Sequence, residues 1–204
     1  MKKDFGKLAS EKSINKTKDA LEKNGIKVFV VENGAEAKEK ALQIIPAGVE
    51  IMTMSSVTVD SIGLAKEINE SGKYNPVRKK FATMDAKTQG QEMKKLGAAP
   101  KWVTGSVHAV TEDGKVIVVS ATGSQLPAYA YGSSNVVWVV GSQKIVRDLD
   151  EGMRRIEEYV FPLENERAKK VYGGGSSINK ILIFNKEGTP ARITMIIVKE
   201  KLGF

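Results

Sequence analysis

The sequence predicts an α/β fold in which a mostly parallel β-sheet is covered by helices on both faces. Over the first 70 residues, short apolar runs alternate with segments rich in helix-forming residues. Strands buried on both faces read as continuous apolar runs, and helices between them provide the crossovers of a parallel sheet. The most apolar run of the chain, residues 136–140, is therefore expected to be a central strand.

Local signals place the elements of the first half. A Lys-rich helix ends at Asn24-Gly25, a pair typical of a helix C-cap. A second helix, over residues 35–45, stops at Pro46, because proline disfavours helical backbone at the residue before it. Strands are expected at 27–31 and 49–54, further helices at about 55–69 and 84–96, and a connector at 71–84.

The second half contains more strands. Residues 102–104 and 106–111 are strand-like, and Asp113-Gly114 between two β-rich runs favours a hairpin with a return strand at 115–120. The remaining expectations are a loop at 121–134 with at most one helical turn, an extension of the central strand or a further strand at 143–146, an amphipathic helix at 148–160, a helical piece at 163–172, a loop at 173–177, and strands at 181–184 and 193–198.

Length and composition predict one domain over residues 1–204. Hydrophobic residues make up 41% of the chain and charged residues 27%, as in ordinary globular proteins. The absence of cysteine excludes disulfides, thiolate nucleophiles, Cys-type zinc sites and iron–sulfur ligation by this chain. His108 is the single histidine, so a multi-histidine metal site is excluded and no metal is expected.

The charge of the chain bears on its partners. The net charge of +8 comes from 32 basic and 24 acidic residues, and the excess is spread along the chain except for a short basic run at 78–80. Nucleic-acid-binding proteins more often show a dense basic stripe, so a solvated surface that attracts anionic metabolites is favoured over a nucleic-acid face. No apolar run is long enough to span a membrane, and with no signal sequence at the N-terminus we expect a cytoplasmic protein.

A strand-to-helix junction is the first candidate site for a ligand. Ligands of open α/β sheets bind outside the carboxyl ends of the strands. Ser55, Ser56 and Thr58 offer hydroxyl groups at such a junction, which suits an anion. The alternative is simple N-capping of the following helix by Ser55 or Ser56.

Two further loops have a suitable composition. Gly123 would allow a ligand to approach the backbone closely, and Ser124 and Gln125 add hydrogen-bond donors ahead of the most apolar strand. Residues 173–177 contain three glycines, but no Lys-Ser/Thr pair ends the run as in a P-loop, so a flexible connector is the favoured interpretation.

Glu112 is the candidate catalytic carboxylate. It lies at a strand end, where it could act as a nucleophile or as a general base. The alternative is a hairpin turn in which Asp113-Gly114 suffices and Glu112 is incidental. His108 lies within a β run, where a single histidine more often serves packing than catalysis.

Several segments of the chain resemble the LUD domain family, which is linked to lactate utilisation. The likeness is carried by residues 104–173, from TGSVHAVTEDGK to ERAKKVYG, by MSSVTVDSIGL at 54–64 and by GSSINKIL at 175–182. The resemblance implies a three-layer α/β sandwich around a mostly parallel sheet, similar to the NagB/RpiA/CoA-transferase group. In CoA transferases, an acidic residue before a strand resembles Glu112, but Asp113 stands where LUD sequences commonly have Thr.

The resemblance also suggests functions. LUD proteins take part in oxidation of lactate to pyruvate beside iron–sulfur oxidoreductase subunits, which would be possible partners here. Our first hypothesis is an accessory or ligand-binding protein of lactate or carboxylate metabolism that binds an anionic small molecule. The second is a CoA- or phosphosugar-type enzyme that uses Glu112, and the third is a nucleic-acid-binding module. The cofactor is left open, and a homo-oligomer is possible.

Overall fold

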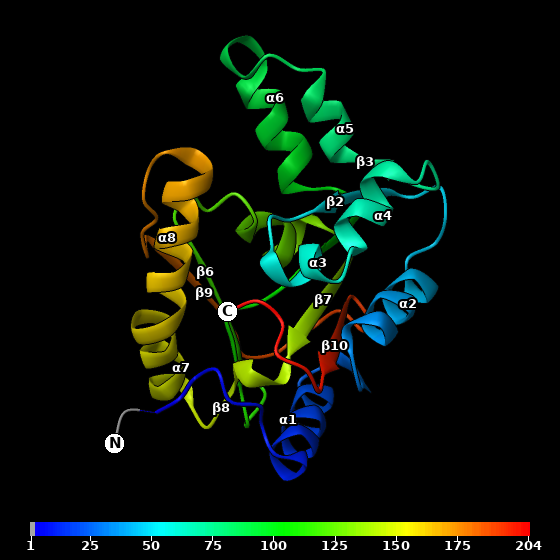
Figure 1. Cartoon of the computed structure of the whole chain (residues 1–204). Coiled ribbons are helices and arrows are strands. Elements are labelled where there is room, and N and C mark those ends of the chain that lie inside the picture. The colour runs from blue at the N-terminus through cyan, green and yellow to red at the C-terminus, as the bar shows by residue number, and fades with distance from the viewer. Residues whose placement is uncertain (1–2) are drawn as a thin grey trace.

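The computed structural model describes residues 3–204 and contains a six-stranded sheet in which every pair of neighbouring strands is parallel (Figure 1). In spatial order the strands are β1 (Lys27–Val31), β10 (Ile193–Val198), β7 (Asn135–Gly141), β4 (Trp102–Gly105), β2 (Glu50–Thr53) and β3 (Asn75–Pro76). The predicted central strand is confirmed, because β7 pairs with β10 on one side and with β4 on the other.

A second, four-stranded sheet packs against the first. Its strands, in spatial order, are β8 (Ile145–Val146), β5 (Ala109–Thr111), β6 (Val116–Ser120) and β9 (Lys180–Phe184). The predicted hairpin is confirmed, since Ala109 of β5 lies opposite Ile117 of antiparallel β6. Gly114 in the turn has a φ of +83°, a backbone conformation that favours glycine. The sequence placed most of these strands but did not assign them to a separate sheet.

Helices cover one face of the large sheet. They are α2 (Gly34–Ile44), α3 (Val57–Ser61) and α4 (Leu64–Glu70). Ala41 of α2 and Leu64 of α4 are fully buried in one apolar cluster with Val139 and Ile196 of the sheet. Alternate residues of one strand point to opposite faces, so Trp138 of β7 lies in a different cluster on the far side.

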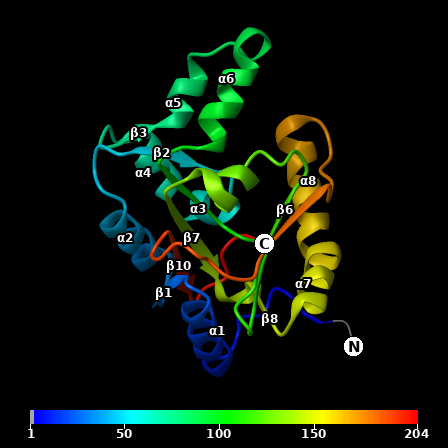
Figure 2. The same ribbon diagram turned by 180° about the vertical axis from the view of Figure 1, so that it is seen from behind.

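The far side of the large sheet is covered by the second sheet and by α1 (Glu11–Lys23). Trp138 packs edge-on against Tyr129 and Phe184, with ring centroids 5.4 and 5.2 Å away. A nearly continuous helical segment covers the outer face of the second sheet, as Figure 2 shows. It consists of α7 (Leu149–Arg155), the π-type turn η3 (Ile156–Val160) and α8 (Phe161–Tyr172). The predicted α/β fold, a mostly parallel sheet flanked by helices, is confirmed.

Some predicted elements differ from the structure. The single helix expected at about 55–69 is two helices, because Gly63 adopts a left-handed conformation with a φ of +68° and interrupts the helix. The expected connector at 71–84 is wrong, since it contains β3 and the helix α5 (Val77–Ala82). For residues 143–146 the alternative of a further strand is confirmed in part, because they do not extend β7 and strand β8 follows a 3-10 turn, η2 (Ser142–Lys144).

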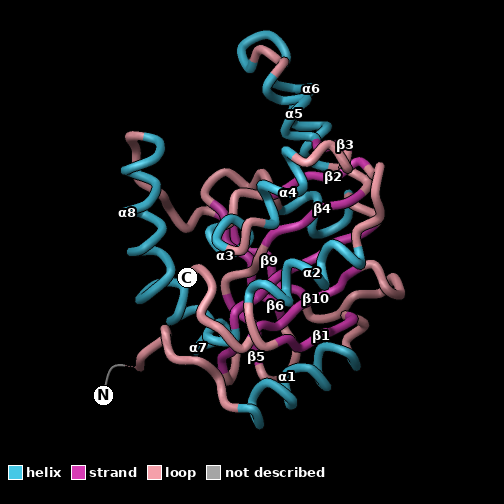
Figure 3. Tube along the Cα trace, turned by 45° about the vertical axis from the view of Figure 1, so that its right-hand side comes forward, coloured by secondary structure: helices cyan, strands magenta, loops and turns pink. Residues whose placement is uncertain are grey.

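A helical hairpin projects from the edge of the large sheet. It is formed by α5 and α6 (Ala86–Ala98), and it extends beyond the body of the protein in two views (Figures 1 and 3). No residue of α6 is buried. The π-type turn η1 (Ala128–Gly132), within the loop expected at 121–134, contacts the inner end of this hairpin.

Candidate functional site

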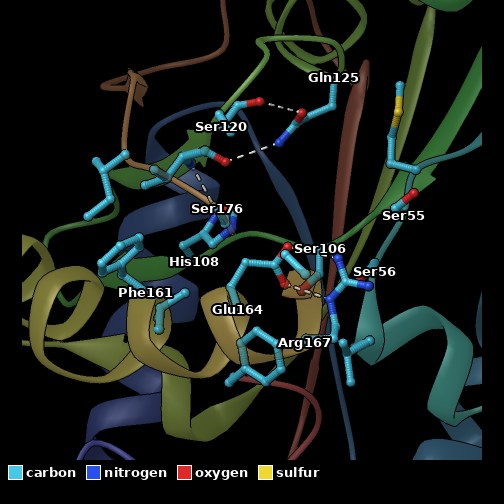
Figure 4. A pocket seen from close by; sticks show the side chains of 18 of the residues that line it. Ser55, Ser56, Ser106, His108, Ser120, Gln125, Phe161, Glu164, Arg167 and Ser176 are labelled. Carbon is cyan, nitrogen blue, oxygen red and sulfur yellow. Dashed lines mark hydrogen bonds and ion pairs between the residues drawn. The ribbon is translucent and has the colours of Figure 1, made fainter. Parts of the chain in front are cut away.

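A cavity of about 640 Å³ lies at the carboxyl ends of the parallel strands β2 and β4. Its lining includes residues 54–58, which follow β2, and residues 106–108, which follow β4. Residues 119–122, 124–125 and 175–178 and one side of α8 complete most of the wall. All three loops that the sequence marked as candidates thus reach one cavity, at the edge where open α/β sheets bind ligands. Figure 4 shows this cavity from close by.

The two serines of the β2–α3 junction have different partners. Ser56 is the N-cap of α3, and its Oγ accepts a hydrogen bond from the Val59 N–H at 3.4 Å. The capping alternative therefore holds for Ser56. Ser55 is exposed, and its Oγ accepts a hydrogen bond from the guanidinium of Arg78 at 2.9 Å. Arg78 also donates from Nε to the Thr53 carbonyl at 2.8 Å, so the end of β2 holds this guanidinium beside Ser55.

The loop after β6 is held in shape by hydrogen bonds from within. Ser120 Oγ accepts from the Gly123 N–H at 2.8 Å and donates to Gln125 Oε1 at 2.9 Å. The Gln125 side-chain amide donates to the Val119 carbonyl at 3.1 Å, so both ends of this amide are used (Figure 4). Ser124 is exposed at the cavity. Gly123 has a φ of +88° and lines a neighbouring cavity rather than the first.

An ion pair on α8 forms the opposite wall. Arg167 and Glu164 make two parallel hydrogen bonds, at 2.7 and 2.8 Å (Figure 4). This bidentate pairing raises the pKa of Arg167 further and neutralises both charges. The other acidic residue of the lining is Asp60, whose pKa is raised because neighbouring atoms partly desolvate the carboxyl group, against the opposing effect of Arg78 and Arg167.

Lys144 is the functional candidate that the sequence interpretation missed. It follows β7 in the 3-10 turn η2, lines the cavity and is only 2% exposed. Its Nζ donates to Thr58 Oγ1 at 2.9 Å, to Ser106 Oγ at 3.0 Å and to the Val107 carbonyl at 3.2 Å. A lysine four residues after the end of the most apolar run was the available signal, because ligands bind at the carboxyl end of a central strand.

The partners of Lys144 are all acceptors and all neutral. Thr58 Oγ1 donates its own proton to the Leu202 carbonyl, and Ser106 Oγ donates to the Val139 carbonyl. Three acceptors fit the three N–H bonds of an ammonium group. Within residues 3–204, no carboxylate forms a salt bridge with Nζ. Burial therefore holds the pKa of Lys144 well below its usual value, and the positive charge of Arg155 lowers it further.

His108 lies in the same wall and is neutral. Its Nδ1 accepts a hydrogen bond from the Val119 N–H at 3.0 Å, which leaves the proton on Nε2. Burial lowers its pKa to about 3, and the charges of Lys144 and Arg155 act in the same direction. The side chain is partly exposed to the cavity, so it can offer a neutral N–H donor there.

Glu112 lies away from this cavity. Its carboxylate accepts a hydrogen bond from Ser13 Oγ at 2.6 Å and pairs with Lys16 Nζ at 2.8 Å, both from α1. These two contacts lower its pKa. Glu112 is absent from the lining of both cavities described here, so its catalytic role stays a prediction without a ligand site beside it.

A second cavity of about 580 Å³ adjoins the first. The helical hairpin α5–α6 forms one of its walls, through residues that include Phe81 and Met93. Met54, Ser55, Thr122, Ser124 and Gln125 line both cavities. Of the predicted site residues, Ser55, Ser56, Thr58, Ser124 and Gln125 line the first cavity, and Gly123 lines the second. The structure thus brings these residues together, and their role in binding stays a prediction.

The described residues contain neither a cluster of metal ligands nor a membrane-spanning helix. Within residues 3–204, no group of three or more histidine, cysteine, aspartate or glutamate residues is placed to hold a metal ion. Among the helices of the same residues, none has the length and apolar character needed to cross a membrane.

Comparisons with known proteins identify the family of this chain. The structure is similar to the crystal structure of a DUF162 family protein from Deinococcus radiodurans, with a TM-score of 0.60 and 12% sequence identity over 94% of this chain and 99% of that chain. At this identity the likeness concerns the fold alone. No curated protein matches the sequence. A family model of the LUD domain matches residues 14–201. Because this match spans most of its length, the chain belongs to the LUD domain family.

Proposed function

We propose that this protein binds an anionic small molecule in the cavity beside Lys144, as an accessory or ligand-binding protein of lactate or related carboxylate metabolism. The single observation that carries the proposal is Lys144 itself. A buried ammonium group is costly unless an opposite charge compensates it. Its hydrogen-bond partners in the described residues are neutral, so an anion bound in the cavity would supply the compensating charge.

The magnitudes favour Lys144 over the serine hydroxyls as the main source of affinity. A neutral hydrogen bond contributes about 1 kcal/mol net, whereas a hydrogen bond to a charged group contributes about 1.5–3 kcal/mol. A unit anion about 4 Å from the ammonium would gain roughly 4 kcal/mol at an effective dielectric constant of about 20. Ser55, Ser124 and the Nε2–H of His108 would then orient the anion rather than provide most of the binding energy.

The carboxylate class rests on the family. The sequence resembles a family linked to lactate utilisation, and the small ligands of that chemistry are hydroxy and oxo carboxylates. Conversion of lactate to pyruvate releases two electrons, and the 204 residues contain no cysteine that could hold an iron–sulfur cluster. An oxidative role would therefore depend on partner subunits, and binding of the carboxylate would be the contribution of this chain.

Calorimetric titration with lactate, pyruvate and inorganic phosphate tests the proposal. We expect saturable binding of at least one carboxylate, together with a higher melting temperature in its presence. Lys144→Met should weaken that binding at least tenfold, because it removes the charge attraction between the buried lysine and the anion. Lys186→Met is the matched control, because Lys186 is exposed and lies outside both cavities.

Two results would count against the proposal. One is the absence of binding for every member of the panel. The other is equal affinity in the wild type and in a Lys144→Met protein whose circular dichroism spectrum shows a folded chain. If Lys144→Met fails to fold, Ser55→Ala and Ser124→Ala provide the second comparison, since both side chains are exposed at the cavity and removing their hydroxyls should weaken binding severalfold.

A further inference from the structure

The second cavity differs from the first in its chemistry. Its wall includes the apolar side chains of Met52, Met54, Phe81, Met93 and Pro127. Methionine side chains are flexible and polarizable, so they adapt to apolar groups of different shapes. Its charged lining residues, within the part of the chain that the structure describes, are the cations Arg78 and Lys94.

The two cavities meet along a shared wall. Met54 and Ser55 from the end of β2 and Thr122, Ser124 and Gln125 from the loop after β6 line both of them. The two cavities therefore lie side by side, and a ligand that occupies both would pass these five residues. The two cavities have volumes of about 640 and 580 Å³, and each volume lies in the range of ordinary ligand pockets.

Arg78 marks the place where the two cavities meet. Its guanidinium is held by the Thr53 carbonyl and by Ser55 Oγ, and within residues 3–204 it has no carboxylate in a salt bridge. Arg78 lines the second cavity, and its positive charge beside Ser55 adds to the attraction of Lys144 for an anion near this boundary. In the second cavity the Thr53 carbonyl and Ser55 occupy Arg78, and Lys94 is exposed, so the apolar side chains there favour an apolar chain.

The hairpin α5–α6 leaves the apolar wall open. No residue of α6 is buried, and Met93, on the side that faces the cavity, is only partly covered. Hydrophobic surface of this kind is stabilised when an apolar group covers it, at about 25 cal/mol per Å² of buried area. A ligand that also reaches Lys144 would cover this surface with its apolar part and place its anionic group near the lysine.

From this juxtaposition we infer that the ligand is a carboxylate with an apolar chain, bound with its carboxylate near Lys144 and its chain between the β2 end and α6. The inference rests on the proposed function, because it assumes that an anion occupies the first cavity. It goes further by naming the ligand as amphiphilic and by assigning the methionine-lined cavity to its apolar part.

A series of carboxylates of increasing chain length tests the proposed function and this inference separately. The dissociation constants of acetate, butanoate, hexanoate and octanoate are measured by calorimetry, below the concentrations at which the longer members form micelles. We expect the affinity to rise about two- to fourfold for each added CH2 until the second cavity is full, as the burial of methylene groups predicts. Lys144→Met should weaken all members by a similar factor and leave this increment unchanged.

Met93→Asp tests the apolar half specifically. A carboxylate in the methionine-lined cavity should abolish the gain in affinity with chain length, so octanoate should lose far more affinity than acetate relative to the wild type. Gln91→Asp is the matched control, because it places the same charge on an exposed position of the same helix outside both cavities. Octanoate should bind Gln91→Asp as it binds the wild type.

The possible outcomes are distinct. A rising series that becomes flat in Met93→Asp supports the inference. The inference is overturned if the affinity of the wild type does not change with chain length, or if it still rises with chain length in Met93→Asp. The proposed function stays intact in both cases as long as short carboxylates bind. If no carboxylate of any length binds, both the inference and the proposed function are wrong.

Discussion

The ammonium of Lys144 and the hydroxyl of Thr58 lie 2.9 Å apart, although 86 residues separate them in the sequence. This contact joins the turn after the central strand β7 to the first turn of α3. Thr58 also donates to the carbonyl of Leu202, so three distant segments meet at one hydroxyl. The lysine is thereby held in place before any ligand arrives, which reduces the conformational entropy lost on binding.

Ligand affinity should depend on pH through Lys144. Burial keeps its pKa low in the free protein, and a bound anion would raise it. Between these two pKa values binding takes up a proton, so the affinity should fall as the pH rises, by up to about tenfold per pH unit. Titrations from about pH 6 to about pH 9, in buffers that differ in ionisation enthalpy, measure this uptake. Lys144→Met should show no uptake, and equal heats for the wild type in all buffers would contradict the prediction.

The stability of the fold towards acid should depend on His108. Its pKa is lowered to about 3, from about 6.5 in the unfolded chain, so the unfolded state binds more protons between these values. The free energy of unfolding should therefore fall as the pH drops through this window, by up to about 1.4 kcal/mol per pH unit. Urea unfolding of the wild type and His108→Gln measures the slope. In His108→Gln the free energy of unfolding should depend less steeply on pH, by the slope that the binding of about one proton contributes. An unchanged slope would show that His108 is not responsible.

The two serines of the β2–α3 junction should separate stability from binding. Ser56 caps α3, so Ser56→Ala should lower the free energy of unfolding by about 0.5–2 kcal/mol. Ser55→Ala should leave stability within about 0.5 kcal/mol and weaken carboxylate binding, since the hydroxyl is exposed and Arg78 is its hydrogen-bond partner among the described residues. Chemical unfolding and calorimetric titration of both proteins provide the comparison. The reverse pattern would mean that the assigned roles are exchanged.

Gly105 should tolerate no side chain. A Cβ atom at this end of β4 would lie 1.9 Å from Tyr129 Oη, and Tyr129 is fully buried. Gly105→Ala should therefore destabilise the protein by about 1–3 kcal/mol. Adding Tyr129→Phe to Gly105→Ala should restore part of this loss, because the oxygen that clashes is gone. Thermal and urea unfolding measure both effects.

Gly90 provides the opposite case on the same chain. It lies within α6, and nothing stands within 4 Å of a Cβ built there. Gly90→Ala should raise the free energy of unfolding by up to about 1 kcal/mol through helix propensity alone. A destabilised Gly90→Ala protein would show that α6 is not a regular helix in solution.

The sequence located several loops of the candidate site but not its buried lysine, Lys144. Ser55 and Gly123 were found because a strand end followed by small polar residues is a local pattern, and parallel strands place such ends at one edge. Lys144 was missed because its burial depends on Thr58 and Ser106, residues brought to it by tertiary packing alone. No local pattern distinguishes a lysine that turns inward from one that turns towards solvent.

The same distinction explains the errors in the fold. The long strands β7 and β10 were predicted because they are buried on both faces and therefore apolar throughout. The strand β3 was missed because it has two residues, too few for any periodicity to show. Glu112 was chosen because it lies at a strand end, whereas the contacts that occupy its carboxylate come from Ser13 and Lys16, almost 100 residues earlier in the chain.

The projecting hairpin gives the protein a part that can change independently of the rest. Because α6 buries none of its side chains, substitutions along it remove little of the energy that holds the two sheets together. Surface segments on a rigid scaffold accept new sequences more readily than core segments do. Substitutions in the hairpin would therefore change the wall of the second cavity and leave the packing around Lys144 intact.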